Sequence, residues 1–422
     1  MAPEGSTGHG SPRASLPVAV TPRPLSGRRL LHTPALAARN ELLNTESAFE
    51  VLDRARALEA TGRDVVHLEI GQPDFPTPGH IVDAAFKAIQ DGATGYAPTV
   101  GIPELREAVA ETTADSRGVD VTPAQVAITP GAKPIMFFSL LACVEPGDEV
   151  IYPDPGFPIY ESVIRFIGAR PVPLPLREDL GFRFDVDQLR ELVTPKTRML
   201  IVNSPGNPTG GVLGDRELDA IADLATANRF WVLSDEVYSR LLYGSVHRSI
   251  LSYDGMADLT ILLDGVSKTY AMTGWRLGWG VMPERLVEAL GLLMVNSNSC
   301  TAPFTQHAGV AALRGPQDAV DDMHAEFAAR RDLLIDGLNA IDGMRCEKPE
   351  GAFYAFPNIT ALSPDDGRFA RDLLEEAGVA TLWGSSFGSH GAGHLRLSYA
   401  NSREALAEAL RRIRAFAENV SR

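Results

Sequence analysis

The sequence predicts an α/β protein with a large, mostly parallel sheet between helices and a smaller α+β domain. From Val126 onward, short apolar runs alternate with helical runs, the pattern of a parallel sheet covered on both faces. A chain of 422 residues is long enough for two domains. A long helical run over residues 316–341 is suited to link them.

The elements before the sheet are a polar arm and three helical runs. Residues 1–30 are rich in Pro, Gly, Ser and Arg and lack hydrophobic periodicity, so we expect a disordered arm. Helical periodicity then appears over 47–60, 80–90 and 102–113, with a short strand over 65–70.

The large sheet is predicted to have seven strands. They are the apolar runs 126–129, 149–152, 170–173, 199–203, 230–234, 259–263 and 277–281. Helical runs between them include 135–143, 157–168 and 215–228. After residue 351, short strands mix with helices over 368–377 and 402–417. We therefore expect four parts: an arm (1–35), the N-terminal part of the small domain (36–75), the large cofactor-binding domain (76–315), and the linking helix with the C-terminal small domain (316–422).

Composition excludes several classes of partner. The net charge of −15 argues against nucleic acid or an anionic membrane. No apolar run approaches the roughly 20 residues of a membrane span. Cys143, Cys300 and Cys346 lie far apart without a C-x-x-C motif, which favours a reducing, cytoplasmic setting. His390 and His394 are separated by two glycines that disfavour a helix, so we expect no metal site there.

Lys268 follows the apolar run 259–263 and is one of only five lysines among the 39 basic residues. In parallel sheets, ligands bind at the carboxyl ends of the strands. A lysine there can lose its proton and act as a nucleophile, which a guanidinium cannot do. Taken alone, Lys268 could equally be a solvated loop residue.

Other strand ends carry polar groups as well. Residues 131–133 open a helix, where backbone N–H groups can hold a phosphate. Asn207 lies in a loop rich in Pro and Gly after the run 199–203. Asp235 ends the run 230–234, and Tyr238 follows three residues later. A buried carboxylate needs a cationic partner, although Asp235 could instead cap a helix.

These groups, with Arg276 eight residues after the lysine, fit a pyridine aldehyde that has a phosphate arm. The lysine would form an imine, and the carboxylate would keep the ring nitrogen protonated. The Asn and Tyr would bond the phenolic oxygen, and the arginine would pair with the phosphate.

From about residue 36 to its end, the sequence resembles the class I/II aminotransferases, the aspartate-aminotransferase-like family of fold type I pyridoxal phosphate enzymes. The residues 267–276 (Ser-Lys…Met-Thr-Gly-Trp-Arg) are similar to the family's lysine segment, 203–210 to its Asn-Pro-Thr-Gly loop, and 234–238 to its Asp-Glu-x-Tyr element. The resemblance implies a role for each cofactor contact. Lys268 would be the Schiff-base lysine, Asp235 the ring-nitrogen partner, Asn207 and Tyr238 the partners of the phenolic oxygen, and Arg276, Ser267 and the backbone of Gly131, Ala132 and Lys133 the phosphate site.

Four further positions follow from the resemblance. Phe157 would stack on the cofactor ring, unless it only packs its helix. Tyr96 would reach the phosphate of a neighbouring subunit, which implies a homodimer with shared sites; otherwise it packs inside its own subunit. Gly71 would close over the substrate, and Arg396 would bind the substrate α-carboxylate unless it faces solvent.

The sequence departs from the family at Gly265, where many relatives carry a hydroxyl. It also departs at Gly156-Phe157-Pro158, which replaces a more aromatic pair, and at Pro134. With these departures, Ser267 and Arg276 would make more of the contacts to the phosphate, and the aromatic surface that stacks on the cofactor ring would be smaller.

The expected function is transamination between an α-amino acid and a 2-oxo acid through Lys268. Lys133 would meet an acidic side chain, which favours aspartate or glutamate, unless it serves the phosphate; the partner's loop 296–301 would line the same pocket. One alternative is another pyridoxal phosphate chemistry: oxidation, β/γ-elimination or carbon–carbon bond formation. A cofactor-sensing regulator is a further alternative, but residues 1–35 are too few and too polar for a DNA-binding module.

Overall fold

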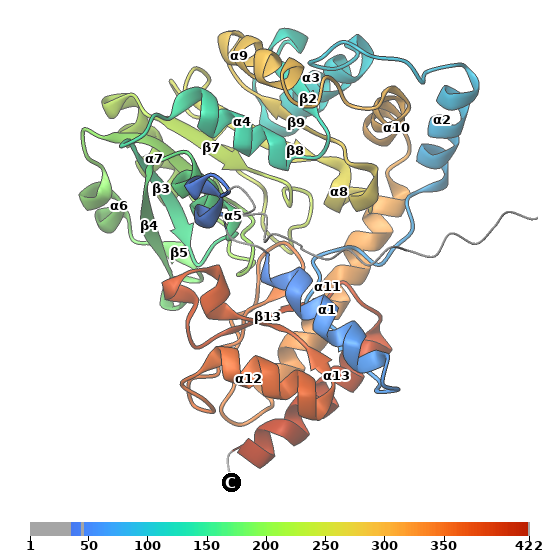
Figure 1. Ribbon diagram of the computed structural model, residues 1–422, viewed down its shortest axis with the longest axis vertical. Helices are drawn as coiled ribbons and strands as arrows, with labels where there is room; N and C mark the ends of the chain where they lie inside the picture. The colour runs from blue at the N-terminus through green and yellow to red at the C-terminus, as the bar shows by residue number, and fades with distance from the viewer. Residues whose placement is uncertain (1–34, 44–45, 421–422) are drawn as a thin grey trace, which may run out of the picture. The chain divides into compact units, whose positions relative to one another are not determined.

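The computed structural model describes residues 35–43 and 46–420, so the predicted arm lies outside the described residues except at its last residue. The described chain from Arg39 onward forms one compact unit, shown in Figure 1. The domain boundaries given above stay predictions. Among the described residues, no helix is both long and apolar enough to cross a membrane.

The large sheet confirms the predicted fold class and has eight strands. Their order is β2 (Val126–Thr129), β9 (Gly278–Val281), β8 (Thr260–Gly265), β7 (Trp231–Asp235), β6 (Thr197–Asn203), β3 (Glu149–Asp154), β4 (Arg170–Arg177) and β5 (Arg183–Phe184). Strands β8, β7, β6, β3 and β4 are mutually parallel, and β9 is antiparallel to both of its neighbours. The additional strand is β5, a two-residue edge strand too short to give a periodic signal.

Helices cover both faces of this sheet (Figure 1). One face packs against α4 (Lys133–Cys143), α5 (Ile159–Phe166) and α9 (Glu284–Val295). The other packs against α2 (Gly79–Gln90), α3 (Pro103–Arg117), α6 (Val186–Leu192), α7 (Asp215–Asn228) and α10 (Pro303–Arg314). Adjacent residues such as Val150 and Ile151 enter cores on opposite faces. This two-sided burial explains why the strands are continuous apolar runs.

The second core lies around two small sheets. The first has the order β10 (Tyr354–Ala355), β13 (Leu395–Ser398), β12 (Leu382–Trp383), and the second pairs β1 (Val66–His67) with β11 (Val379–Ala380). The helices around them are α1 (Ser47–Glu59), α11 (Asp318–Asn339), α12 (Asp366–Asp372) and α13 (Arg403–Val420). The β1–β11 pair joins a segment that precedes the large sheet to the C-terminal part of the chain.

The carboxyl ends of the central strands lie side by side. Asn203, Asp235 and Leu263 are in register across β6, β7 and β8. The short helix α8 (Val266–Thr269) begins directly after β8 and carries Lys268. Three segments distant in sequence therefore deliver polar side chains to one edge of the sheet.

Candidate active site

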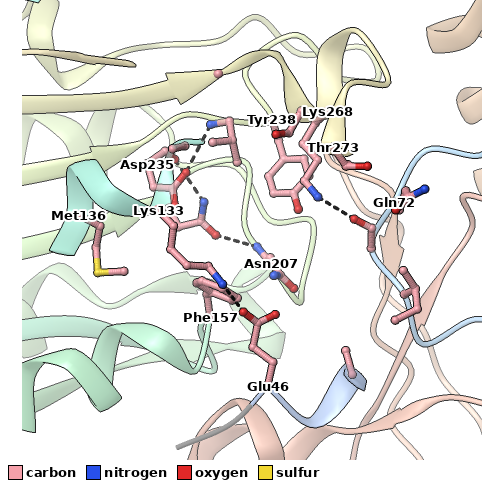
Figure 2. A pocket seen from close by; sticks show the side chains of 18 of the residues that line it. Glu46, Gln72, Lys133, Met136, Phe157, Asn207, Asp235, Tyr238, Lys268 and Thr273 are labelled. Atoms are coloured by element: carbon pink, nitrogen blue, oxygen red, sulfur yellow. Dashed lines mark hydrogen bonds and ion pairs between the residues drawn. The ribbon is translucent and has the colours of Figure 1, made fainter. Parts of the chain in front are cut away.

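A cavity of about 540 Å³ lies at these strand ends and gathers most of the predicted site residues (Figure 2). Its volume is in the range of small-molecule sites. The predicted residues that line it are Gly71, Ala132, Lys133, Phe157, Asn207, Asp235, Tyr238, Ser267, Lys268, Arg276 and Arg396. Of the predicted set, Gly131 and Tyr96 are not among the lining residues.

Lys268 points into this cavity, where its Nζ donates a hydrogen bond of 2.6 Å to the Gly71 carbonyl oxygen. Shielding from water lowers the pKa of Lys268 to about 8, and the positive charge of Arg396 acts in the same direction. Only a glycine lets the backbone at position 71 lie this close to Tyr354, because a Cβ there would lie 2.1 Å from the Tyr354 hydroxyl oxygen. Lys268 is therefore a buried amine that is partly uncharged near neutral pH, as a nucleophile requires.

Asp235 ends β7 and is 9% exposed. The Tyr160 hydroxyl donates to its Oδ2 at 2.6 Å, and the Val237 amide donates to its Oδ1 at 3.4 Å. Burial raises the pKa of Asp235 to about 6, against the opposing hydrogen bond from Tyr160. Residues 237–240 form a turn, so Asp235 does not cap a helix. A buried carboxyl group on the wall of a cavity suits a cationic group of a ligand.

Arg396 lies on β13 and is 4% exposed, so it does not face solvent. Its guanidinium donates to Asn207 Oδ1 at 3.2 Å and to the Glu69 carbonyl oxygen. Its Nε has no hydrogen-bond partner among the described residues. Burial lowers the pKa of Arg396. A buried guanidinium with a spare donor at a cavity is suited to bind a carboxylate.

Two tyrosines complete this side of the cavity. The hydroxyl groups of Tyr238 and Tyr354 lie 2.8 Å apart, and the Arg396 guanidinium lies 4.6 Å from the Tyr354 ring centroid. Tyr354 thus contacts both Arg396 and Tyr238.

The start of α4 forms a cradle with Arg276. A Cβ on Gly131, which has φ +90°, would lie 2.2 Å from an Arg276 guanidinium nitrogen, so only glycine leaves room for that side chain. A Cβ on Gly278 would lie 2.4 Å from the Ala132 amide nitrogen. The Arg276 guanidinium therefore lies against the backbone at Gly131, beside the start of α4, and such a pairing suits an anion.

Gly265 also has a packing reason. A Cβ at this position would lie 3.0 Å from the Gly278 Cα atom. The close pairing of β8 with β9 thus accounts for a glycine at this position. Ser267, two residues on, still lines the cavity.

A buried charged cluster lies behind the strand ends. Arg117 donates to Glu236 at 2.9 Å and to Asp264 at 3.4 Å. His247 lies 2.8 Å from Glu236, and the Ser249 hydroxyl donates to the same carboxylate at 2.5 Å. Because Glu236 directly follows Asp235 and Asp264 precedes α8, this cluster fixes the ends of β7 and β8.

Glu46, Tyr160 and Tyr354 are among the cavity residues that were not predicted. Tyr160 could have been found from its helical spacing, because it lies three residues after Phe157 on the same face. Glu46 and Tyr354 reach the cavity from distant elements, and nothing in their local sequence indicates a site.

Other predicted features lie outside the cavity. The Tyr96 side chain is 94% exposed, and residues 296–301 do not line the cavity of their own chain. His390 pairs with Asp154 at 2.9 Å, and His394 stacks on Phe356. In the described part of the chain, no three His, Cys, Asp or Glu side chains are grouped as a metal site would need.

The cavity fits pyridoxal phosphate. It provides a buried amine (Lys268), a buried carboxyl group (Asp235), and a guanidinium beside the start of helix α4 (Arg276), and all three line the same cavity. These are the groups needed for an aldehyde, a ring nitrogen and a phosphate.

Known proteins resemble this chain over most of its length. Residues 63–413 match the family model described as aminotransferase class I and II. A probable aspartate/prephenate aminotransferase from Aquifex aeolicus is 38% identical over 392 residues, covering 91% of this chain and 99% of the relative. Aromatic-amino-acid aminotransferase 2 from Thermococcus litoralis is 41% identical over 383 residues, covering 90% and 97%. The structure of aspartate aminotransferase from Thermus thermophilus with maleate matches with a TM-score of 0.88 at 37% identity, covering 91% of this chain and all of that one (100%).

Proposed function

The chain belongs to the class I and II aminotransferases, which use pyridoxal phosphate, and from this premise we propose a role for each group in the cavity. When bound, pyridoxal phosphate supplies an aldehyde that condenses with amines and a ring that accepts an electron pair. The observation that carries the proposal is the convergence of Lys268, Asp235 and Arg396 on one cavity.

Lys268 has two tasks in this proposal. Its uncharged amine would hold the cofactor through the aldehyde between turnovers, and once free it would move the substrate α-proton. Its lowered pKa, about 8, supports both tasks because a useful fraction is unprotonated near neutral pH. The Gly71 carbonyl oxygen, at 2.6 Å, orients the amine.

The remaining cofactor contacts have separate tasks. An ionised Asp235 would hold the proton on the ring nitrogen, and Tyr160 orients that carboxylate through its 2.6 Å hydrogen bond. Further groups would contact the ring and the phosphate. They are Asn207 and Tyr238 for the phenolic oxygen, Phe157 for the ring face, and Arg276, Ser267 and the backbone of Gly131, Ala132 and Lys133 for the phosphate.

The substrate is an α-amino acid whose α-carboxylate binds Arg396 beneath Gly71. For the side chain we propose aspartate or glutamate, because the Lys133 ammonium group stands at the cavity. The relatives are named for aspartate/prephenate and for aromatic amino acids, so membership of the family leaves the side chain open.

We also propose a homodimer with shared sites. The exposed Tyr96 and the segment 296–301 belong to one surface, since the Ala97 amide donates to Cys300 Sγ at 3.5 Å. On α2 and α9, the large apolar side chains Phe86, Ile89, Leu292 and Val295 are exposed. A cytoplasmic location stays a proposal, supported by the free thiols of Cys143, Cys300 and Cys346.

The experiment is a complete amine cycle followed by cofactor absorbance. Purified protein should be yellow, lose its colour on addition of aspartate, and regain it with 2-oxoglutarate. Borohydride should link the cofactor to Lys268, as peptide mapping would show. Lys268→Ala should lose both the linkage and turnover, whereas Lys348→Ala, at a surface pair with Asp332, should keep both. A Lys268→Ala protein that turned over at the wild-type rate would refute the proposed role.

A further inference from the structure

Glu46 brings a negative charge into a cavity that otherwise holds mostly cations. Its carboxylate accepts a hydrogen bond from Lys133 Nζ (Figure 2). The Glu46 side chain is 22% exposed and that of Lys133 is 47% exposed, so the pair lies at the outer side of the cavity. Asp235 is the only other acidic residue in the lining.

The position of Glu46 is not explained by helix capping. Glu46 directly precedes α1, yet its side chain makes no capping hydrogen bond. Its carboxylate instead reaches Lys133, 87 positions along the chain. The interaction therefore serves the cavity rather than the start of the helix.

The same region of the cavity is also apolar. Phe49, three residues after Glu46 and on the first turn of α1, lines the cavity although its ring is exposed. Met136 and Phe157 line it as well, and Lys133 Nζ lies 5.3 Å from the Phe157 ring centroid. An apolar substrate side chain would therefore find contact surface beside the ion pair.

The Glu46–Lys133 ion pair affects the binding of acidic and of neutral substrate side chains differently. An acidic side chain must compete with Glu46 for Lys133, and it repels Glu46. A neutral side chain leaves the Glu46–Lys133 pair intact. Neither charge of the pair is then removed from water without its partner.

We infer that Glu46 is a specificity-determining residue: by pairing with Lys133, it lets the pocket accept neutral, aromatic side chains and weakens its preference for acidic ones. The inference rests on the proposed function and on the placement of Lys133 at the substrate side chain. The ligand classes are dicarboxylic and aromatic α-amino acids.

The test compares the holoenzyme with Glu46→Gln. In the variant, kcat/KM for aspartate should rise and kcat/KM for phenylalanine should fall. The ratio of the two values should increase about tenfold, because the loss of one partly exposed ion pair favours aspartate and disfavours phenylalanine. Glu50→Gln removes the same charge from the first turn of α1, where the side chain lines a different cavity. This control should leave the ratio unchanged.

Equilibrium binding gives a second readout. Maleate, a dicarboxylate, should bind Glu46→Gln more tightly than wild type, whereas 3-phenylpropionate should bind it more weakly, as measured by calorimetry. In a Lys133→Gln background, Glu46→Gln should lose its opposite effects on the two ligands, because the pair no longer exists.

The outcomes separate the two proposals. A wild-type protein that transaminates no donor refutes the proposed function. Suppose that wild type transaminates, but Glu46→Gln leaves the ratio of kcat/KM for aspartate to that for phenylalanine unchanged, or changes the affinities for maleate and 3-phenylpropionate by the same factor. The inference about Glu46 is then wrong, and the proposed function stands.

Discussion

Among single residues, Tyr160 has the most direct control over a proposed catalytic group. Burial raises the pKa of Asp235 to about 6, and the hydrogen bond from Tyr160 opposes this rise. In Tyr160→Phe the pKa of Asp235 should therefore rise further. Because Asp235 acts as the anion, the acid limb of the kcat/KM profile should move to higher pH, with roughly a three- to tenfold loss at pH 7.

A matched control is Tyr253→Phe, which removes a hydroxyl that donates to Asp215 far from the cavity. Its pH profile should equal that of wild type. A Tyr160→Phe enzyme with reduced rates but an unmoved acid limb would show that Tyr160 contributes packing alone.

The residues that sequence reasoning found share a local signal. Lys268, Asp235 and Asn207 each follow an apolar strand, and parallel strands bring their ends together. Tyr354 and Glu46 lack such a signal. Tyr354 lies on a strand of two residues in a different sheet, and Glu46 precedes a helix without capping it. Their roles depend on tertiary contacts, which a single sequence does not encode locally.

Among elements, the ends of β7 and β8 depend on the charged cluster around Arg117, which lies on the last turn of α3. Burial alone would raise the pKa of Glu236, but the charges of His247 and Arg117 and the hydrogen bond from Ser249 outweigh it and hold this pKa at about 2. Asp264 can take up a proton near neutral pH, because burial raises its pKa to about 7. Glu236 therefore carries most of the negative charge that loses a partner when Arg117 is removed.

Arg117→Ala should lower the free energy of unfolding by about 3–5 kcal/mol at pH 7, because it leaves a buried carboxylate without its arginine. A carboxylate whose pKa is depressed by folding adds stability above its unfolded pKa and loses it as the pH falls. The gap between wild type and variant should therefore be full above pH 4.5 and close toward pH 2, the range between the ordinary and folded pKa of Glu236. Denaturant titrations at several pH values measure this gap.

The control for that experiment is Arg314→Ala. Arg314 pairs with Glu111 at the surface, where both side chains are largely exposed. Its loss should cost less than ~1 kcal/mol and show little pH dependence. An Arg117→Ala protein that is no less stable than this control would mean that the cluster does not hold the strand ends.

The elements themselves could be predicted to different degrees. Long buried strands such as β6 and long helices such as α7 (Asp215–Asn228) have strong periodic patterns, and their predicted and observed bounds nearly coincide. The pairing of β1 with β11 joins two-residue strands from opposite ends of the chain. Such pairing is decided by the packing of the second core, so no local pattern indicates it.

For the whole molecule, the proposed site is complete only if two chains meet. Tyr96 is 94% exposed and lies away from the cavity of its own chain, where it has no task. If it reaches the phosphate in a partner's cavity, the protein should be a dimer by light scattering. Tyr96→Phe should then weaken cofactor retention by about 1 kcal/mol, the value of one hydrogen bond.

Hybrid dimers test the sharing of the site directly. Co-expression of a Lys268→Ala chain with a Tyr96→Phe chain yields hybrids in which one cavity pairs the intact Lys268 of one chain with the intact Tyr96 of the other. If half of the dimers are hybrids, about a quarter of all cavities should then retain cofactor as wild type does. If Tyr96 serves its own chain, every cavity with Lys268 lacks the hydroxyl, and no tight population appears. Cofactor dissociation followed by absorbance after dilution distinguishes one kinetic phase from two, and a single fast phase would contradict the shared site.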